Sequence, residues 1–171
     1  KTPSPLTHAL ESEGIAVHYE DNTNFVPKDV ESTLVVYTPA VPKDMGELVY
    51  VQEKGYRVIK RSRMLGEISA GQRCMAVAGT HGKTTTSTMA AHLLHQSHVK
   101  CNAFLGGISK NYGTNLLLSN DSDYVVIEAD EFDRSFHWLS PYATVITATD
   151  ADHLDIYGTK EAYLESFSHY T

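Results

Sequence analysis

Residues 75–86 constrain the fold of this 171-residue chain more than any other stretch. Residues 75–78 are apolar and have the length of a buried strand, and a helix-forming pattern starts at Lys83 and continues to about His95. Between them lies a short loop with two glycines, Gly79-Thr-His-Gly-Lys-Thr84. A strand that turns tightly into a helix is half of a βαβ unit, so the segment predicts parallel strands covered by helices.

The rest of the chain alternates between short apolar runs and helical patterns in the same way. We expect strands at residues 15–19, 34–37, 56–59, 75–78, 102–105, 124–127 and 143–147, and helices at 6–10, 45–54, 63–69, 83–95 and 160–170. Runs 124–127 and 143–147 are continuously apolar, which predicts central strands covered on both faces. The fold class is therefore α/β with mostly parallel sheets, and a small polar break at residues 70–72 predicts domains at 1–71 and 72–171.

The loop after residue 78 has the chemistry of a phosphate-binding turn. Glycines let backbone N–H groups point at phosphate oxygens, and the helix N-terminus adds partial positive charge. Lys83 would reach the β- and γ-phosphates, and the Thr84 hydroxyl would bind Mg²⁺. The strict P-loop pattern fails because Val77 stands where its first glycine belongs, and an ordinary strand–turn–helix corner is the alternative. We predict that ATP is bound by Gly79, Thr80, His81, Gly82, Lys83, Thr84 and Thr85.

Two later strands end in acidic and histidine side chains. Glu128-Ala-Asp-Glu131 follows run 124–127, and Asp150-Ala-Asp-His153 follows run 143–147. Because ligands of open α/β sheets bind at the carboxyl ends of strands, we expect both segments beside the phosphate loop. Carboxylate oxygens suit Mg²⁺, and His153 could hold a second metal ion or contact the transferred phosphoryl group. Taken alone, each cluster is also typical of a solvated acidic loop.

Composition excludes several kinds of partner. With 14 Lys and Arg against 21 Asp and Glu, the net charge is −7, which argues against binding nucleic acid or anionic lipid through bulk charge. No apolar run approaches the ~20 residues of a membrane span. Cys74 and Cys101 give no disulfide framework; they fit a reducing cytoplasm, where free cysteines are small buried apolar residues.

Three histidines recur near the end of the helix after Lys83, at His92, His95 and His98. Successive steps of three sweep ~60° around a helix, so the outer pair need not converge on one ion. Histidines are also favoured in a last helical turn by the helix dipole. We therefore favour a structural role over a zinc site.

Taken together, these motifs resemble those of the Mur ligases, ATP-dependent enzymes that form amide bonds in peptidoglycan synthesis. The family's ATP loop is similar to residues 79–86, and its metal and histidine motifs are similar to residues 128–136 and 152–158. A substrate-facing loop of the family is similar to residues 106–108 with 113–115, and the end of its nucleotide-sugar domain is similar to residues 38–42. These motifs occur along the chain in the family's order.

The resemblance implies a partial Rossmann-like UDP-sugar-binding domain followed by the first part of a P-loop-type central ATPase domain. It also implies that this chain is a fragment of a three-domain enzyme, without the C-terminal domain. The cofactors would be ATP and Mg²⁺, and the substrates UDP-N-acetylmuramate and L-alanine, joined through an acyl phosphate. Lys83 and His153 would be the catalytic residues. The metal ligands would be Thr84 and Glu128, which hold Mg²⁺, and His153, which binds a second metal ion or the acyl phosphate. The residues facing the substrates would be Thr38, Ala40, Thr114 and Asn115.

Three other functions remain open on the sequence. One is a ligase of the same family that recycles a murein tripeptide, although the direct passage from Phe136 to the next strand favours the alanine-adding activity. The second is an unrelated P-loop kinase or NTPase, and the third is a nucleotide-binding module without catalysis. The last predicts that Lys83→Ala leaves ATP binding intact, whereas the enzymes predict a large loss.

Overall fold

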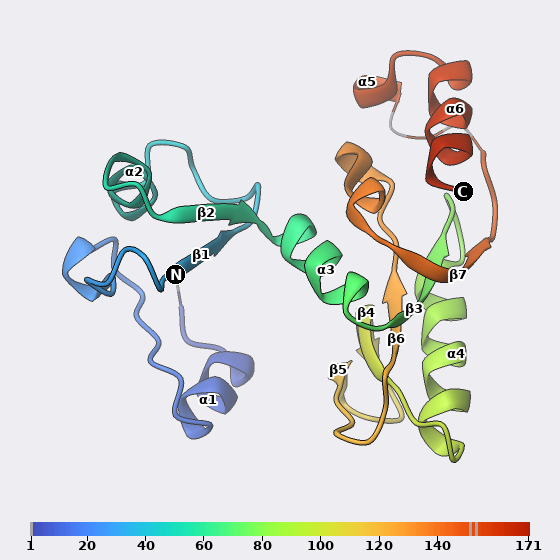
Figure 1. Ribbon diagram of the computed structural model, residues 1–171, viewed down its shortest axis with the longest axis horizontal. Coiled ribbons are helices and arrows are strands. Elements are labelled where there is room, and N and C mark those ends of the chain that lie inside the picture. Colours follow the sequence, from blue (N-terminus) through green and yellow to red (C-terminus); the bar gives the residue numbers. More distant parts are fainter. Residues whose placement is uncertain (1, 151, 153) are drawn as a thin grey trace. The chain divides into compact units, whose positions relative to one another are not determined.

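The computed structural model describes residues 2–150, 152 and 154–171. The chain folds into two compact units, Lys1–Arg61 and Ser62–Thr171 (Figure 1). The helix at residues 61–70 therefore belongs almost entirely to the second unit. Within the described residues, no helix combines the length and the hydropathy needed to cross a membrane.

The first unit is built around two parallel strands. Its elements are α1 (Pro5–Ser12), the 3₁₀ helix η1 (Thr23–Phe25), β1 (Leu34–Tyr37), α2 (Gly46–Glu53) and β2 (Arg57–Lys60). Strand β1 pairs with β2 in parallel. Helix α2 buries Leu48 and Val51 beside Tyr56, against Val35 and Val58 of the two strands. Four of these five elements were predicted at nearly the same positions, because their apolar runs and glycine stops are clear.

The strand predicted at residues 15–19 is wrong. The segment is coil that pairs with no strand in the described part of the chain. Its side chains attach it to the helices instead: the Tyr19 hydroxyl donates to Thr7 Oγ1 at 2.9 Å, and the His18 ring lies 2.8 Å from Glu47. A β-branched and aromatic run becomes a strand only where a partner strand is available, which the run itself does not reveal.

The second unit contains a five-stranded sheet among its described residues, in the order β5-β4-β6-β3-β7. Its elements are α3 (Arg61–Ala70), β3 (Arg73–Ala78), α4 (Lys83–Gln96), β4 (Asn102–Ser109), β5 (Thr114–Leu117), β6 (Tyr124–Glu128), the 3₁₀ helix η2 (Phe132–Trp138), β7 (Pro141–Ile146), α5 (Leu154–Tyr157) and α6 (Lys160–Tyr170). Strands β4, β6, β3 and β7 are parallel, and β5 is antiparallel to β4. The predicted α/β fold with mostly parallel sheets is confirmed.

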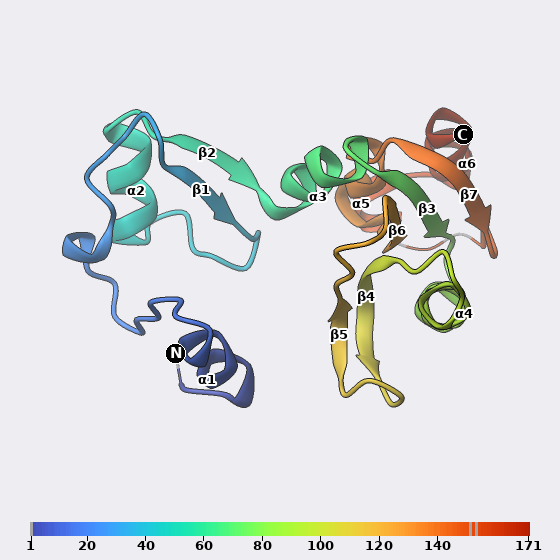
Figure 2. The same cartoon turned by 60° about the horizontal axis from the view of Figure 1, so that its bottom comes forward.

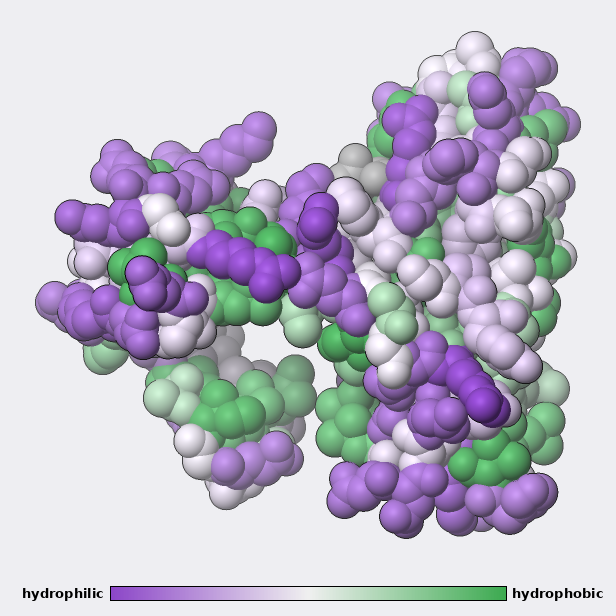
Figure 3. Space-filling view, viewed as in Figure 1, coloured by the Kyte–Doolittle hydropathy of each residue, from purple (hydrophilic) through white to green (hydrophobic). Residues whose placement is uncertain are grey.

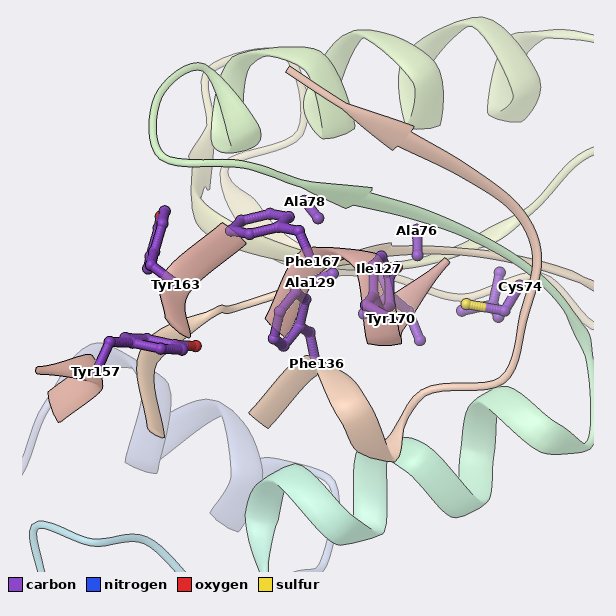
Figure 4. Packing of buried hydrophobic residues seen from close by; sticks show 11 residues of the cluster. Cys74, Ala76, Ala78, Ile127, Ala129, Phe136, Tyr157, Tyr163, Phe167 and Tyr170 are labelled. Carbon is purple, nitrogen blue, oxygen red and sulfur yellow. The ribbon is translucent and has the colours of Figure 1, made fainter. Parts of the chain in front are cut away.

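Helices cover both faces of this sheet. Figure 2 shows α4 on one face and α6 on the other. On the α4 side, Ala91 packs with Ala103 and Val126. On the other side, aromatic residues of η2, α5 and α6 pack over apolar residues of β3 and of β6 with the residue that follows it, most of which Figure 4 labels: Phe136, Tyr157, Tyr163, Phe167 and Tyr170 over Cys74, Ala76, Ala78, Val125, Ile127 and Ala129. Successive residues of β6 therefore enter opposite cores, which confirms the central strand predicted at residues 124–127.

The prediction for residues 143–147 is wrong in one respect. The strand forms, as β7, but it is an edge strand, and 69% of Tyr142 is exposed. The opposite edge strand, β5, was not predicted, because it is short and follows a turn. Exposed apolar side chains occur at both edges and on α4, among polar ones (Figure 3): Met89, Leu93, Leu116, Leu118, Tyr142, Val145 and Ile146. An apolar run indicates a strand, but it does not show which neighbours cover that strand.

Both cysteines are buried and free. Burial raises the pKa of Cys74 and of Cys101 to about 11, because a thiolate would be poorly solvated there. The cysteines are therefore small apolar core residues, as predicted.

Candidate functional site

The predicted phosphate loop forms a tight turn between β3 and α4. Gly79 and Gly82 have positive φ angles of +124° and +80°, which residues with a Cβ rarely adopt. A Cβ on Gly79 would also collide with Thr147 Oγ1 and would lie 2.8 Å from the backbone N of Ala148. Gly79 is thus required by its backbone angle and by the lack of space.

Helix α4 starts at this turn with open backbone donors. Gly82 is its N-cap and supplies no side-chain cap, and the first turn carries no acidic residue. The first N–H groups of a helix have no partner within the helix, so this end can accept an anion. His81 and Thr85 are exposed at the same end. The predicted phosphate-binding backbone therefore has the expected form.

Lys83 folds back over the loop and contacts a buried carboxylate. Its ammonium group donates to the carbonyl oxygen of Gly79 at 2.7 Å and to Glu131 Oε1 at 2.9 Å, and it lies 2.8 Å from Glu131 Oε2. The Glu131 side chain is 1% exposed. A cation is thus fixed beside the open end of α4.

Glu128 and Thr84 meet at the carboxyl end of β6. The Thr84 hydroxyl donates to Glu128 Oε1 at 3.1 Å, and the backbone N–H of Gly106 donates to Glu128 Oε2 at 3.0 Å. Mg²⁺ binds oxygens at about 2.1 Å in octahedral geometry, so two neighbouring ligands lie about 3.0 Å apart. The separation of the Thr84 and Glu128 oxygens fits a pair of ligands to one such ion.

Thr80 has a structural position. Its hydroxyl donates to the carbonyl oxygen of Asp150 at 2.7 Å and is hydrogen-bonded to the Tyr163 hydroxyl at 3.0 Å. Burial raises the pKa of Tyr163 above its ordinary value, so its hydroxyl keeps its proton. The hydroxyl of Thr147, the residue that follows β7, donates to the carbonyl oxygen of His81 and so connects the end of β7 to the loop. The backbone N–H of Thr80 donates to the carbonyl oxygen of Ala148 at 2.9 Å. Both the side chain and the amide of Thr80 are therefore bonded within the protein, and Thr80 holds the loop in place rather than offering a donor to a phosphate.

The remaining predicted metal ligand, His153, lies outside the described residues. Among the described ones, no three His, Cys, Asp or Glu side chains gather closely enough to hold an ion. Thr84 and Glu128 thus offer two protein oxygens to an ion. Mg²⁺ typically takes one or two carboxylates together with water and substrate phosphates, so this small set is compatible with a nucleotide-bound ion.

The four predicted substrate residues fall in two places. Thr114 and Asn115 open β5, in the hairpin that follows Gly106; Asn115 is exposed, and Thr114 Oγ1 accepts from the amide of Leu116. Thr38 and Ala40 belong to the first unit, in the turn after β1, where Thr38 Oγ1 accepts from the Ala40 amide.

The histidines of α4 have protein partners. The His92 ring lies 2.9 Å from the Tyr112 hydroxyl, and the His95 ring packs edge-on against the same tyrosine. Gln96 also donates to that hydroxyl, at 3.1 Å. These contacts attach the β4–β5 turn to α4, which agrees with the structural role predicted for these residues.

Glu131 and Thr147 were not predicted as site residues, and Gly106 was expected only as part of a substrate-facing loop. Glu131 stood in the acidic motif, but the sequence does not show which of its three acids faces the lysine. Gly106 carried a recognisable signal, because glycine inside a strand often marks a close approach of another group. Its Cβ would lie 2.5 Å from Glu128 Cδ. No feature of the sequence around Thr147 indicated that this residue would contact the phosphate loop.

Comparison with known proteins agrees with this geometry. Residues 77–170 match the Mur ligase middle domain, and residues 2–73 match the Mur ligase family, catalytic domain. The chain belongs to the Mur ligase family. UDP-N-acetylmuramate–L-alanine ligases are similar to it over its whole length, at 67% identity for Phocaeicola vulgatus and 63% for Parabacteroides distasonis. The chain spans 38% of the length of these curated relatives.

Two solved Mur ligase structures share its fold. The UDP-N-acetylmuramate–alanine ligase of Thermotoga maritima superposes with a TM-score of 0.82 at 31% identity, over 96% of this chain and 38% of that one. The UDP-N-acetylmuramate:L-alanyl-γ-D-glutamyl-meso-diaminopimelate ligase of Neisseria meningitides gives 0.84 at 26% identity, over 99% and 57%. The fold is therefore common to Mur ligases named for different substrates.

Proposed function

We propose that this chain carries the nucleotide-sugar and phosphate-binding parts of an ATP-dependent ligase that joins L-alanine to UDP-N-acetylmuramate. The observation that carries the proposal is the meeting of Lys83, Thr84 and Glu128 at the open N-terminus of α4. The 67% identity to a ligase named for these two substrates supports their choice.

The proposed division of labour follows the two regions. We assign residues 1–71 to part of the UDP-sugar-binding domain and residues 72–171 to the first part of the ATP-binding domain. This division follows the family matches, which meet between residues 73 and 77, whereas the compact units of the structure divide at Arg61 and Ser62. Thr38 and Ala40 contact the nucleotide sugar, and Thr114 and Asn115 face the acceptor substrate. ATP and nucleotide sugars are cytoplasmic metabolites, so we place the protein in the cytoplasm.

In this proposal the loop positions ATP rather than reacting with it. The backbone N–H groups of residues 79 and 81–85 bind phosphate oxygens, while Thr80, whose amide donates to Ala148, holds the loop in place. Lys83 contacts the β- and γ-phosphates. Thr84 and Glu128, with His153, hold Mg²⁺, which when bound neutralises phosphate charge. The muramate carboxylate attacks the γ-phosphorus and releases ADP. The alanine amine then attacks the acyl carbon, and inorganic phosphate leaves as the amide forms.

Sequence identity favours alanine over a tripeptide as the second substrate. The fold does not separate the two, since both solved structures superpose almost equally well. Identity is 67% to an alanine ligase, whereas the solved tripeptide ligase is 26% identical. Substrate specificity depends on a few side chains, which follow identity more closely than they follow fold.

Phosphate release tests the proposal. The full-length protein is incubated with ATP, Mg²⁺ and UDP-N-acetylmuramate, with L-alanine, with the tripeptide, or with neither. We expect release that requires L-alanine and is lost in Lys83→Ala. Release with the tripeptide alone would support the recycling activity, and release that needs no amino acid would support a simple NTPase.

A further inference from the structure

Glu131 and Glu128 stand three residues apart but have different partners. Glu128 faces the Thr84 hydroxyl and the Gly106 amide, where it fits a metal ligand. Glu131 faces the ammonium group of Lys83 with both carboxylate oxygens, at 2.9 and 2.8 Å. The charge that should attract phosphates is therefore already matched by a carboxylate within the protein.

The backbone of Glu131 is held firmly in this position. Its carbonyl oxygen accepts from the Tyr157 hydroxyl at 2.6 Å and from the amide of Arg134 at 3.0 Å. Arg134 has a positive φ of +54°, and its guanidinium lies 4.9 Å from the centre of the Tyr157 ring. Strained backbone of this kind persists only where the surrounding structure fixes it. The carboxylate is therefore built into the loop and does not meet Lys83 by chance.

This pairing has two opposite effects on an incoming phosphate. It immobilises a lysine whose four-carbon stem is otherwise flexible, which lowers the entropy lost on binding. It also offsets the ammonium charge, and water cannot replace Lys83 at a carboxylate that is 1% exposed. A phosphate must therefore compete with Glu131 for the lysine.

We propose that Glu131 is a positioning residue that holds Lys83 in the loop and competes with the nucleotide phosphates for its ammonium group. The inference rests on the proposed phosphate site. It predicts that replacing Glu131 with glutamine tightens phosphate binding, since the amide oxygen still accepts from Lys83 but carries no charge. Unit charges several ångström apart interact by more than 1 kcal/mol at an effective dielectric constant of about 20. We expect Kd to fall about tenfold, or about 1.4 kcal/mol.

The test is calorimetric titration of the chain with inorganic triphosphate and with ATP, both in chelator, so that no metal contributes. We expect E131Q to bind both more tightly than the wild type. E131A should bind less tightly than E131Q, because it leaves the Lys83 ammonium group with the carbonyl oxygen of Gly79 but no acceptor at residue 131. A purely structural role for Glu131 cannot produce tighter binding. Asp123→Asn is the matched control, since it removes the same charge at the other end of β6, where Asp123 pairs with Arg73.

The outcomes separate the two proposals. Loss of binding in K83M, with E131Q equal to or weaker than the wild type, would overturn the role of Glu131 and leave the phosphate site intact. Unchanged binding in K83M would overturn the phosphate site itself. If D123N gains as much affinity for triphosphate and ATP as E131Q does, the change in net charge alone explains the gain, and the inference is overturned. If E131Q does not fold, E131D replaces it in the test, because its side chain is one methylene shorter and holds the carboxylate farther from Lys83. E131D must then bind triphosphate and ATP more tightly than the wild type, and weaker or equal binding contradicts the inference.

Discussion

Replacing Gly106 with alanine should disable the metal ligand without unfolding the protein. A Cβ at this position would lie 2.5 Å from Cδ of Glu128 and would overlap its carboxylate. The nearest atoms belong to the end of a flexible side chain, so β4 can stay in place while the carboxylate turns away. The variant therefore separates the site from the fold.

The expected loss follows from two hydrogen bonds. The displaced carboxylate gives up its bonds from the Gly106 amide, 3.0 Å, and from the Thr84 hydroxyl, 3.1 Å. Hydrogen bonds to charged groups contribute about 1.5–3 kcal/mol each in general, and this open site places both near the lower limit. Two such bonds total about 3 kcal/mol, which corresponds to Mg²⁺–ATP binding weakened by about 100-fold.

Calorimetry of ATP binding with Mg²⁺ and with chelator measures this effect. We expect the loss in G106A only when Mg²⁺ is present, with thermal unfolding shifted by no more than a few degrees. Gly71→Ala is the matched control, since its Cβ would make an ordinary contact, 3.7 Å from the carbonyl oxygen of Ile68. Unchanged Mg²⁺-dependent binding in G106A would refute the reasoning, as would an equal loss in the presence of chelator.

Three further predictions concern the loop and the core. In Gly79→Ala, a Cβ meets backbone at a positive φ, so thermal unfolding temperature and ATP binding should both fall; a variant as stable as the wild type would contradict this. K83M should destabilise the chain by about 3 kcal/mol in urea unfolding, because it removes a cationic partner from a buried carboxylate. K83M/E131Q should recover most of that loss, whereas additive losses would count against the pair. The free energy of unfolding should stay constant up to about pH 9 and fall towards pH 11. The cause is that burial raises the pKa of Cys74 and Cys101 to about 11, so both thiols ionise at lower pH in the unfolded chain than in the folded one. Urea unfolding of Cys74→Ala should show a smaller fall over this range, and an identical fall would argue against the thiols as its cause.

The loop and its helix could be predicted from the sequence because their signals are local. Gly79 and Gly82 indicate the turn, and the residues after Lys83 form a helix by their own spacing. The meeting of Thr84 with Glu128 followed from one rule of topology, since parallel strands end at the same edge of the sheet.

The features that could not be predicted from the sequence depend on which segments lie next to each other in the folded chain. Residues 15–19 have strand composition but pair with no strand among the residues that the structure describes, and β7 has core composition at an edge of the sheet that those residues form. Glu131 lies next to Asp130 in the sequence, and only the turn fixed by Tyr157 aims its carboxylate at Lys83. Which acid faces which cation is a property of the folded backbone and not of residue type.

Diffraction from crystals grown with Mn²⁺ and a non-hydrolysable ATP analogue tests the central claim most directly. The anomalous signal of Mn²⁺ should lie about 2.1–2.3 Å from the Thr84 hydroxyl and a Glu128 oxygen, with triphosphate density over the N-terminus of α4 and within reach of Lys83. Triphosphate density elsewhere, or a manganese ion that contacts neither Thr84 nor Glu128, would contradict the account.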